Sequence, residues 1–349
     1  MASSSLKPDI RDFTRPELEA RLAALGEKPS HAAAVFSLLY RKGAASFGEM
    51  GELPPRVPAA LAGAFFLSPF KAPLRRLVSR DGTARLLFAF GGDPAEAVVL
   101  PGKGRLSACL SSQSGCACGC AFCATGRLGL ARSLAPSEIT AQFAACLAEA
   151  GGRLDSLVFM GMGEPFLNWE NVKKAILILS DGRGHHFSQG KMTVSTVGVI
   201  PVIEELASSP LKVKLAVSLV TADPDLRARL VPMETRYPAA KVMEAVRRYC
   251  RARGAQVFLE YIVFDGVNDS PEDARKLLAL MKGADCRLNL IPYNPPGGGA
   301  GVTPRAKLFQ KTMMAAGVRT YLRLEKGSDI AAACGQLAAA EASRQPAGD

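Results

Sequence analysis

The sequence has few histidines, no long hydrophobic run and no apolar leader. Only 3 of its 349 residues are histidine, which leaves little material for a metal site built on Cys–His pairs. The longest apolar stretch, at about residues 58–70, is too short to cross a bilayer, and we expect a core helix there. The N-terminal segment MASSSLKPDIRDFT lacks the apolar core of a signal peptide. We therefore expect a cytoplasmic protein that does not associate with membranes.

Acidic residues are outnumbered by basic ones. The chain has 43 Lys and Arg against 32 Asp and Glu, giving a net charge of +11 and a pI near 9.3. A surplus of this size attracts polyanions such as nucleic acid; a basic enzyme without a polymeric substrate is the alternative. The hydrophobic share of 48% is ordinary for globular proteins, so we expect a sizeable buried core.

The pattern of apolar residues divides the chain into four parts. Residues 1–70 show helical spacing and predict a small N-terminal helical domain. Residues 71–104 contain short β-like runs separated by glycine turns, which indicate a β-hairpin connector. Residues 105–340 alternate between strands and helices, and residues 341–349 form a tail. No repeat of fixed period accompanies this alternation.

The alternation in residues 105–340 predicts an α/β fold with a parallel sheet and helices outside it. Six such units indicate a partial (β/α)6 barrel, whose functional site is expected at the C-terminal ends of the strands. We expect strands at 155–160, 191–196, 212–219, 257–264, 286–293 and 318–324. Helices are expected near 137–150, 169–180, 200–208, 238–253, 270–283 and 305–316.

Five of the nine cysteines fall within fifteen residues, at 109, 116, 118, 120 and 123. The spacing Cys116-x3-Cys120-x2-Cys123 places three thiols in one short loop. Structural zinc usually takes four ligands, and a second ligand pair is missing from the sequence. Soft thiolates also suit iron–sulfur clusters, and three ligands on a four-iron cluster leave one iron open. Cys118 is best read as a spare thiol between ligands.

The cysteine spacing, with Phe122 before the last cysteine, resembles the radical S-adenosylmethionine (SAM) signature. The resemblance implies a [4Fe–4S] cluster on the three thiolates, with SAM on the open iron. The sequence GMGEP, which directly follows the expected strand at 155–160, resembles the motif that binds the SAM amino group. Ser195, Ser218 and Asn294 stand at expected strand ends, where ligands bind in such folds; each alone is equally consistent with a helix cap.

Matching stretches run from about residue 12 to residue 340 and closely resemble the RlmN/Cfr family of RNA methyltransferases, RlmN most of all. They include CLSSQSGCACGCAFCATGRLGLARSLAPSEI, GMGEPFLNWENV, LNLIPYNP and GSDIAAACGQL. The resemblance implies methylation of adenine carbon 2 in 23S rRNA, and possibly in tRNA, with two SAM molecules consumed per turnover. It also implies a low-potential electron donor and a monomeric enzyme.

The same resemblance assigns roles to individual residues. Cys334 is expected to carry the methyl group as S-methylcysteine, and Cys109 to resolve the RNA adduct through a transient disulfide with Cys334. Glu96 is the expected proton acceptor. The expected SAM contacts are Gly163, Glu164, Ser195, Ser218, Leu219, Val220 and Asn294. Val220 stands where the family commonly has histidine, a change that is harmless if the contact is made by the backbone.

Several alternatives stay open at this point. The reaction is either at carbon 2 or, as in the Cfr branch, at carbon 8 of adenine. A radical SAM enzyme with another substrate, and a non-catalytic RNA-binding protein with a structural metal, are the rival classes. Arg41, Lys42, Arg75 and Arg76 on or near the N-terminal helices are candidates for docking RNA, with an ordinary solvated face as the alternative.

Overall fold

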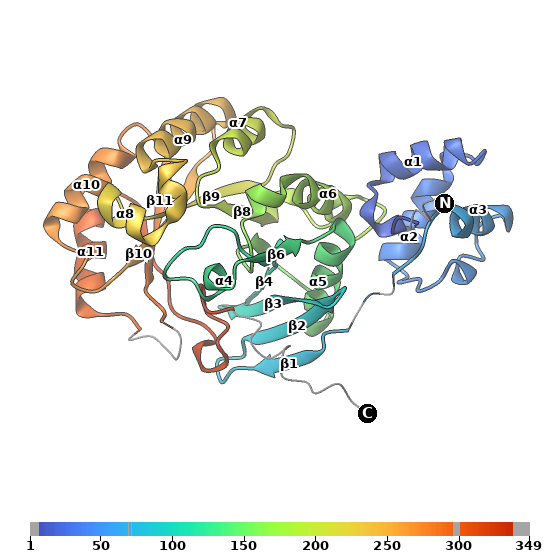
Figure 1. The fold of residues 1–349 in the computed structure, drawn as a ribbon, viewed down its shortest axis with the longest axis horizontal. Helices are drawn as coiled ribbons and strands as arrows, with labels where there is room; N and C mark the ends of the chain where they lie inside the picture. The colour runs from blue at the N-terminus through green and yellow to red at the C-terminus, as the bar shows by residue number, and fades with distance from the viewer. Residues whose placement is uncertain (1–6, 69, 71, 296–300, 338–349) are drawn as a thin grey trace, which may run out of the picture.

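The computed structural model describes residues 7–68, 70, 72–295 and 301–337 (Figure 1). Ten strands form one sheet in the order β1-β2-β3-β4-β7-β8-β9-β10-β11-β12, and β5 and β6 form a separate hairpin. The predicted tail at residues 341–349 lies outside the described residues. In the described part of the chain, no helix is long and apolar enough for a membrane span.

Three helices form the N-terminal part: α1 (Arg15–Ala24), α2 (His31–Tyr40) and α3 (Arg56–Ala64). Thr14 and Glu17 form a capping box that begins α1. The core helix expected at 58–70 is wrong in its second half, because the chain becomes extended at Phe65. The physical reason is a tertiary pairing: the Phe66 N–H donates to Pro8 and its carbonyl accepts from Ile10, which requires extended backbone.

The N-terminal helices dock on the rest of the fold beside α5 (Pro136–Glu149) and α6 (Trp169–Ser180) (Figure 1). Arg15 pairs with Asp181 at 2.9 Å, and the Arg41 guanidinium donates to the carbonyls of Gly182 and Gly184. Two further RNA-docking candidates are also engaged within the chain: Lys42 pairs with Glu52, and Arg76 pairs with Glu149 at 2.7 Å. The RNA-docking role of these cations stays a prediction.

The expected connector forms an antiparallel meander of β1 (Arg75–Val78), β2 (Ala84–Phe90), β3 (Asp93–Gly102) and β4 (Arg105–Cys109). Strand β4 then pairs in parallel with β7 (Ser156–Phe159), so the meander continues the main sheet. The first parallel strand is therefore β4, which the sequence pattern placed only as the beginning of the third part. This continuity brings Glu96 on β3 and Cys109 on β4 to adjacent strands.

The α/β fold with a parallel sheet is confirmed. Beyond β7, the sheet continues in parallel through β8 (Met192–Thr196), β9 (Lys214–Val220), β10 (Val257–Val263), β11 (Cys286–Pro292) and β12 (Thr320–Leu322). The sheet is open, since no pairing joins β12 to β1 among the described strands. Helices α5, α6, α7 (Ile200–Ser208), α9 (Ala239–Arg253), α10 (Pro271–Met281) and α11 (Pro304–Ala315) alternate with these strands and agree with the predicted ranges within a few residues.

Smaller elements on either side of the cysteine loop and after β9 were not predicted. Strands β5 (Gln113–Gly115) and β6 (Leu130–Ser133) pair across α4 (Ala124–Arg127), and α8 (Pro224–Leu230) follows β9. The main core lies between the sheet and its helices, and a second core lies within α1–α3. Two small apolar clusters, one containing Cys109 and one containing Cys118 and Cys120, lie instead at the functional site.

Candidate active site

Polar side chains form a row across four neighbouring strands on one side of the parallel sheet. Ser195 Oγ on β8 lies 3.3 Å from Ser218 Oγ on β9. Ser218 is in register with Glu260 on β10, and Glu260 is in register with Asn289 on β11. The outward residues between them pack into the helix-facing core, so the row lines the opposite, inner side. Parallel strands thus bring together residues that are far apart in sequence.

The cysteine loop between β5 and α4 lies over this inner side. Cys116, Cys120 and Cys123 belong to one small cluster with Phe122 and Val220. The loop is closely folded: a Cβ on Gly126 would lie 2.9 Å from the Cys120 nitrogen. The described residues include no preassembled group of three Cys, His, Asp or Glu side chains positioned for a metal. The thiols lie in this one cluster, called the thiol cluster below, and the Cys118 N–H donates to the Cys116 sulfur at 3.5 Å.

The thiols differ in how readily they lose a proton. Burial raises the pKa of Cys120 to about 12 and also raises the pKa of Cys123. A hydrogen bond with Cys118 lowers the pKa of Cys116, while the same contact raises that of Cys118. Metal ligation requires thiolates, so cluster assembly on these residues releases protons and is favoured at higher pH.

The GMGEP segment after β7 packs very closely against Gln113 on β5, the strand that leads into the cysteine loop. A Cβ on Gly163, whose φ is +96°, would lie 2.5 Å from the Gln113 Cβ, so only glycine fits. Glu164 is 3% exposed and accepts the N–H groups of Val197 and Phe166 at 2.9 and 3.0 Å. Burial raises the pKa of Glu164 to about 7, against the effect of these N–H donors.

Val220 ends β9 in a left-handed conformation with φ of +70°, which is rare for a β-branched residue. Its side chain is fully buried against Cys118 and Cys120, while its neighbour Leu219 faces the main core. The Leu219 carbonyl accepts from buried Arg227, which also donates to the Val197 carbonyl at 2.8 Å. Arg227 thus holds the strained turn, and strain of this kind concentrates at functional sites.

The residues fit a cluster with a small polar ligand beside it. The donor set is three soft thiols in apolar surroundings, which is the chemistry of iron–sulfur ligation. Asn294, which follows β11, is 7% exposed, and its Oδ1 is buried without a hydrogen-bond partner. Such an orphaned acceptor indicates a missing donor from a ligand. The SAM contacts and cluster ligands assigned from sequence stay predictions at the level of individual residues.

The structure brings the three predicted catalytic residues to this site. Cys109 packs with Ala332 and Leu337, which flank Cys334 in sequence. Burial raises the pKa of Cys109 to about 12, and the nearby Cys334 adds to the shift. The Cys334 segment is bound directly to the cysteine loop: the Ala124 N–H donates to the Gly335 carbonyl at 2.7 Å. Glu96 is fully buried one strand away from Cys109 and pairs with Arg85.

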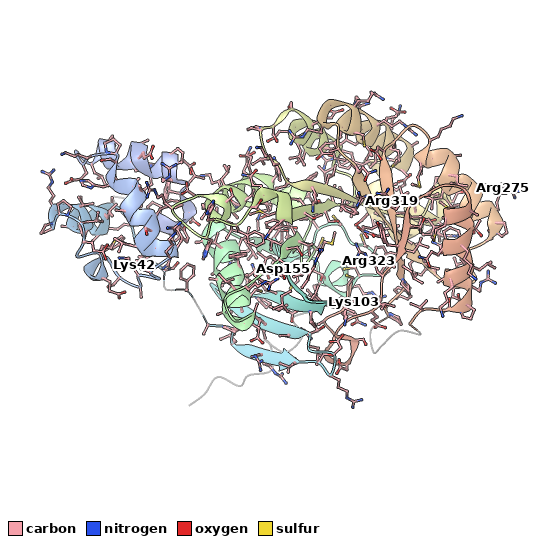
Figure 2. All side chains as sticks on the ribbon, turned by 180° about the vertical axis from the view of Figure 1, so that it is seen from behind. Lys42, Lys103, Asp155, Arg275, Arg319 and Arg323 are labelled. Atoms are coloured by element: carbon pink, nitrogen blue, oxygen red, sulfur yellow. The ribbon has the colours of Figure 1, made fainter. Side chains whose placement is uncertain are left out.

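Cys334 retains solvent-accessible surface, but many protein atoms lie around it. The resulting desolvation raises the pKa of its thiol. Its electrostatic neighbours are Glu260, which raises the pKa further, Arg323, which lowers it, and Cys123. Cys334 therefore lies near both Cys123, a predicted cluster ligand, and Glu260 of the polar row. Figure 2 shows Arg323 toward the middle of the molecule, far from Lys42 on the N-terminal helices.

Sequence reasoning missed Glu260 and Asn289. Glu260 is 7% exposed and accepts from the Asn289 Nδ2 at 2.7 Å, while the Asn289 Oδ1 is buried without a partner. The available signal was a single acidic residue inside the apolar strand VFLEYIV. A buried carboxyl group in such a strand is costly and more often serves a site than a core.

Glu260 is expected to make the ligand-free protein less stable as pH rises. Burial raises its pKa from 4.5 to about 7. Between these two pH values the Glu260 carboxyl keeps its proton in the folded state and loses it in the unfolded state. The free energy of unfolding is therefore highest below pH 4.5 and decreases by about 3 kcal/mol in total as the pH rises to about 7. Urea unfolding at pH 5 and pH 8 measures this loss. Glu164, whose pKa is also raised to about 7, contributes in the same window, so Glu260→Gln should remove only the Glu260 share and reduce the difference between pH 5 and pH 8. An unchanged difference in that variant would contradict the assignment.

Two surface hollows lie elsewhere on the molecule. One, of about 360 Å3, is lined by Tyr40, Arg41 and His185 where the N-terminal helices meet the barrel. Another, of about 410 Å3, is lined by Ser180, His186 and Lys212. Neither is lined by a predicted catalytic, SAM-binding or cluster residue, although the RNA-docking candidates Arg41 and Lys42 line the first. We therefore take the candidate active site to be the region at the strand ends where thiols, carboxylates and strained backbone converge.

Comparison with known proteins shows the family of this chain. Residues 110–278 match the model of the Radical SAM superfamily. A protein from Gemmatimonas aurantiaca described as a probable dual-specificity RNA methyltransferase RlmN is 42% identical over 342 residues, covering 95% of this chain and 93% of that protein. The chain belongs to the RlmN family. A dual-specificity RNA methyltransferase RlmN from an Anaeromyxobacter species is 41% identical, covering 95% of this chain and 91% of that one.

A solved structure supports the whole fold. The crystal structure of a radical SAM methyltransferase from Sphaerobacter thermophilus has a TM-score of 0.87 and 41% identity, covering 95% of this chain and 99% of that one. As an RlmN family member the protein uses a [4Fe–4S] cluster and SAM. The thiol cluster and the orphaned polar acceptors described above are suited to this pair of cofactors.

Proposed function

We propose that this protein methylates carbon 2 of an adenine in RNA, in 23S rRNA and in tRNA, through an S-methylcysteine on Cys334. The RlmN relatives are named dual-specificity RNA methyltransferases, which supports an RNA substrate of more than one kind. The net charge of +11 is consistent with a polyanionic partner. Two SAM molecules are consumed per turnover, one as methyl donor and one as radical source, and a low-potential donor supplies electrons.

The observation that carries this proposal is the convergence of Cys109, Cys334 and Glu96 beside the thiol cluster. Both cysteines stand outside the ligand spacing, and Cys334 lies close enough to Cys109 to raise the pKa of that thiol. A simple methyl transfer from SAM needs no second thiol. A thioether carrier bonded to RNA does, because the carrier must be released from the product by attack at sulfur.

The residues of the chain have distinct tasks. Cys116, Cys120 and Cys123 would hold the cluster, with Gly163, Glu164, Ser195, Ser218, Leu219, Val220 and Asn294 around SAM. When bound, these cofactors supply methyl groups and a hydrogen-abstracting radical. Carbon 2 of adenine is electron-poor and resists electrophilic methylation, so a carbon radical on the Cys334 sulfur suits the reaction better.

Glu96 and Cys109 act after Cys334 has become bonded to the base. Glu96 accepts the proton from the substituted carbon. The Cys109 thiolate attacks the Cys334 sulfur and forms a disulfide as the sulfur–carbon bond breaks. The released carbon takes up a proton to become the methyl group, the one electron left over from radical addition passes to the electron-transfer partner, and the methylated base leaves. A reductant then returns both cysteines to thiols. The target adenine must leave its stack to reach this enclosed site, at a cost of about a few kcal/mol.

Replacing Cys334 is expected to remove methylation without removing the cofactors. Reconstituted protein would be incubated anaerobically with SAM, a reductant and unmodified rRNA or tRNA, and nucleosides would be identified by mass spectrometry. Wild type should yield 2-methyladenosine, and Cys334→Ala none above background, because the methyl carrier is missing. Cys334→Ala should still bind the cluster, since its side chain is not among the three proposed ligands.

The same assay distinguishes the rival functions. Formation of 8-methyladenosine would move the reaction to carbon 8. Release of 5′-deoxyadenosine without an RNA product would indicate another substrate. Full methylation by Cys334→Ala would exclude the carrier mechanism, and comparison of the rRNA and tRNA arms identifies the substrate.

A further inference from the structure

Arg85 joins the proposed proton acceptor to the segment that carries Cys334. Its side chain is buried on β2. Nε donates to Oε1 of Glu96 at 2.9 Å, and Nη2 donates to the same oxygen. The remaining nitrogen, Nη1, donates to the Ile330 carbonyl at 2.8 Å, four residues before Cys334. One guanidinium group therefore contacts both parts of the proposed machinery.

The charge of Arg85 matters because Glu96 is completely buried. The exposed fraction of the Glu96 side chain is 1%, and that of Arg85 is 9%. A carboxyl group removed from water favours its neutral form unless a cation lies beside it. Arginine remains protonated in proteins and presents its donors in a fixed plane. A neutral carboxylic acid cannot serve as a base, so the ion pair keeps Glu96 in the form that the proposed step requires.

The bond to Ile330 is only one of several that hold the Cys334 segment. The turn between β1 and β2 also contributes: Ser79 Oγ donates to Asp329 Oδ1 at 2.5 Å. The Gly327 N–H donates to Asp81 Oδ2 at 3.2 Å. Loss of the Arg85 bond alone leaves these anchors in place. The consequence of losing Arg85 should therefore appear mainly at Glu96.

We propose that Arg85 is a positioning residue that holds Glu96 ionised and in a fixed orientation toward the Cys334 segment during resolution of the RNA adduct. The inference rests on the proposed function, in which Glu96 accepts the proton from the substituted base carbon. Arg85 itself touches neither substrate nor cofactor. Its effect is confined to the step at which Glu96 acts.

The test separates methylation of Cys334 from resolution of the adduct. Arg85→Gln removes the charge and retains hydrogen-bonding groups, and Arg85→Lys retains the charge. Intact-protein mass measures S-methylation of Cys334, and denaturing gels with labelled RNA measure formation and decay of the covalent adduct. In Arg85→Gln, S-methylation should stay within about twofold of wild type, while adduct decay slows by about 100-fold, the usual contribution of a positioned base. Arg85→Lys should recover most of the decay rate.

Asp329→Asn is the matched control, since it weakens another contact of the same hairpin to the Cys334 segment without touching Glu96. Any effect of Asp329→Asn should fall on S-methylation and adduct formation together, and adduct should not accumulate. If Arg85→Gln behaves in the same way, or if its adduct decays at the wild-type rate, the positioning role is overturned.

Glu96→Gln shows which proposal has failed. Slow adduct decay in Glu96→Gln with normal decay in Arg85→Gln refutes the role of Arg85 alone. Normal decay in Glu96→Gln, or a wild type that makes no methyladenosine, refutes the proposed function instead. Thermal unfolding of each variant establishes that the folded protein is being compared.

Discussion

Cys120→Ala is expected to abolish cluster binding, SAM cleavage and RNA methylation together. Cys120 is 6% exposed in the centre of the loop, and its removal leaves two thiols for a cluster that needs three protein ligands. Iron and acid-labile sulfide per chain should fall to near background after anaerobic reconstitution. Release of 5′-deoxyadenosine should fall with them, because the reductive cleavage of SAM depends on the cluster.

Cys118→Ala is the matched control for this prediction. Cys118 is two residues away in the same loop and is also buried, at 2% exposed. We expect it to retain iron, SAM cleavage and methylation close to wild type, because its thiol is a spare group beside Cys116. If Cys118→Ala lost as much iron as Cys120→Ala, the ligand set would include Cys118, and the spacing Cys116-x3-Cys120-x2-Cys123 would not define the ligands.

Most of the fold followed from periodicity. Strong apolar runs such as KVKLAVSL and VFLEYIVF marked β9 and β10, because a parallel strand covered by helices must be apolar along its length. The error at 58–70 had a different origin. The extended backbone at Phe66 is fixed by hydrogen bonds to Pro8 and Ile10, and a contact across more than fifty residues leaves no local pattern.

The site was predictable where chemistry leaves a motif. The cysteine spacing and GMGEP are short-range patterns, and the close approach of Gly163 to Gln113 explains why that glycine is required. Arg85 left no such signal, since an arginine in a β-like run is usually solvent-exposed. Its role depends on the sheet bringing β2 beside β3 and on the return of the chain to Ile330, 245 residues later.

Cys109→Ala is expected to trap RNA covalently on the protein. Cys109 is 7% exposed and packs among small apolar residues, so alanine should fold with a loss of about 1 kcal/mol. Methylation of Cys334 and its bonding to the base do not need Cys109. Release does, because only a neighbouring thiolate can take the Cys334 sulfur as a disulfide partner. A denaturing gel should therefore show a protein–RNA adduct that RNase shortens, with methyladenosine release reduced by at least about 100-fold.

Cys146→Ala provides the comparison that isolates this role. Cys146 on α5 is also buried, and Cys109 is close enough to contribute to the raised pKa of its thiol. Cys146 belongs, however, to the helix-facing core on the other side of the sheet. It should turn over normally and show no adduct. The double variant Cys109→Ala, Cys334→Ala should show none either, since the sulfur that bonds to the base is gone. An adduct that persists in the double variant would place the covalent link on another residue, whereas normal turnover by Cys109→Ala would show that release proceeds without a second thiol.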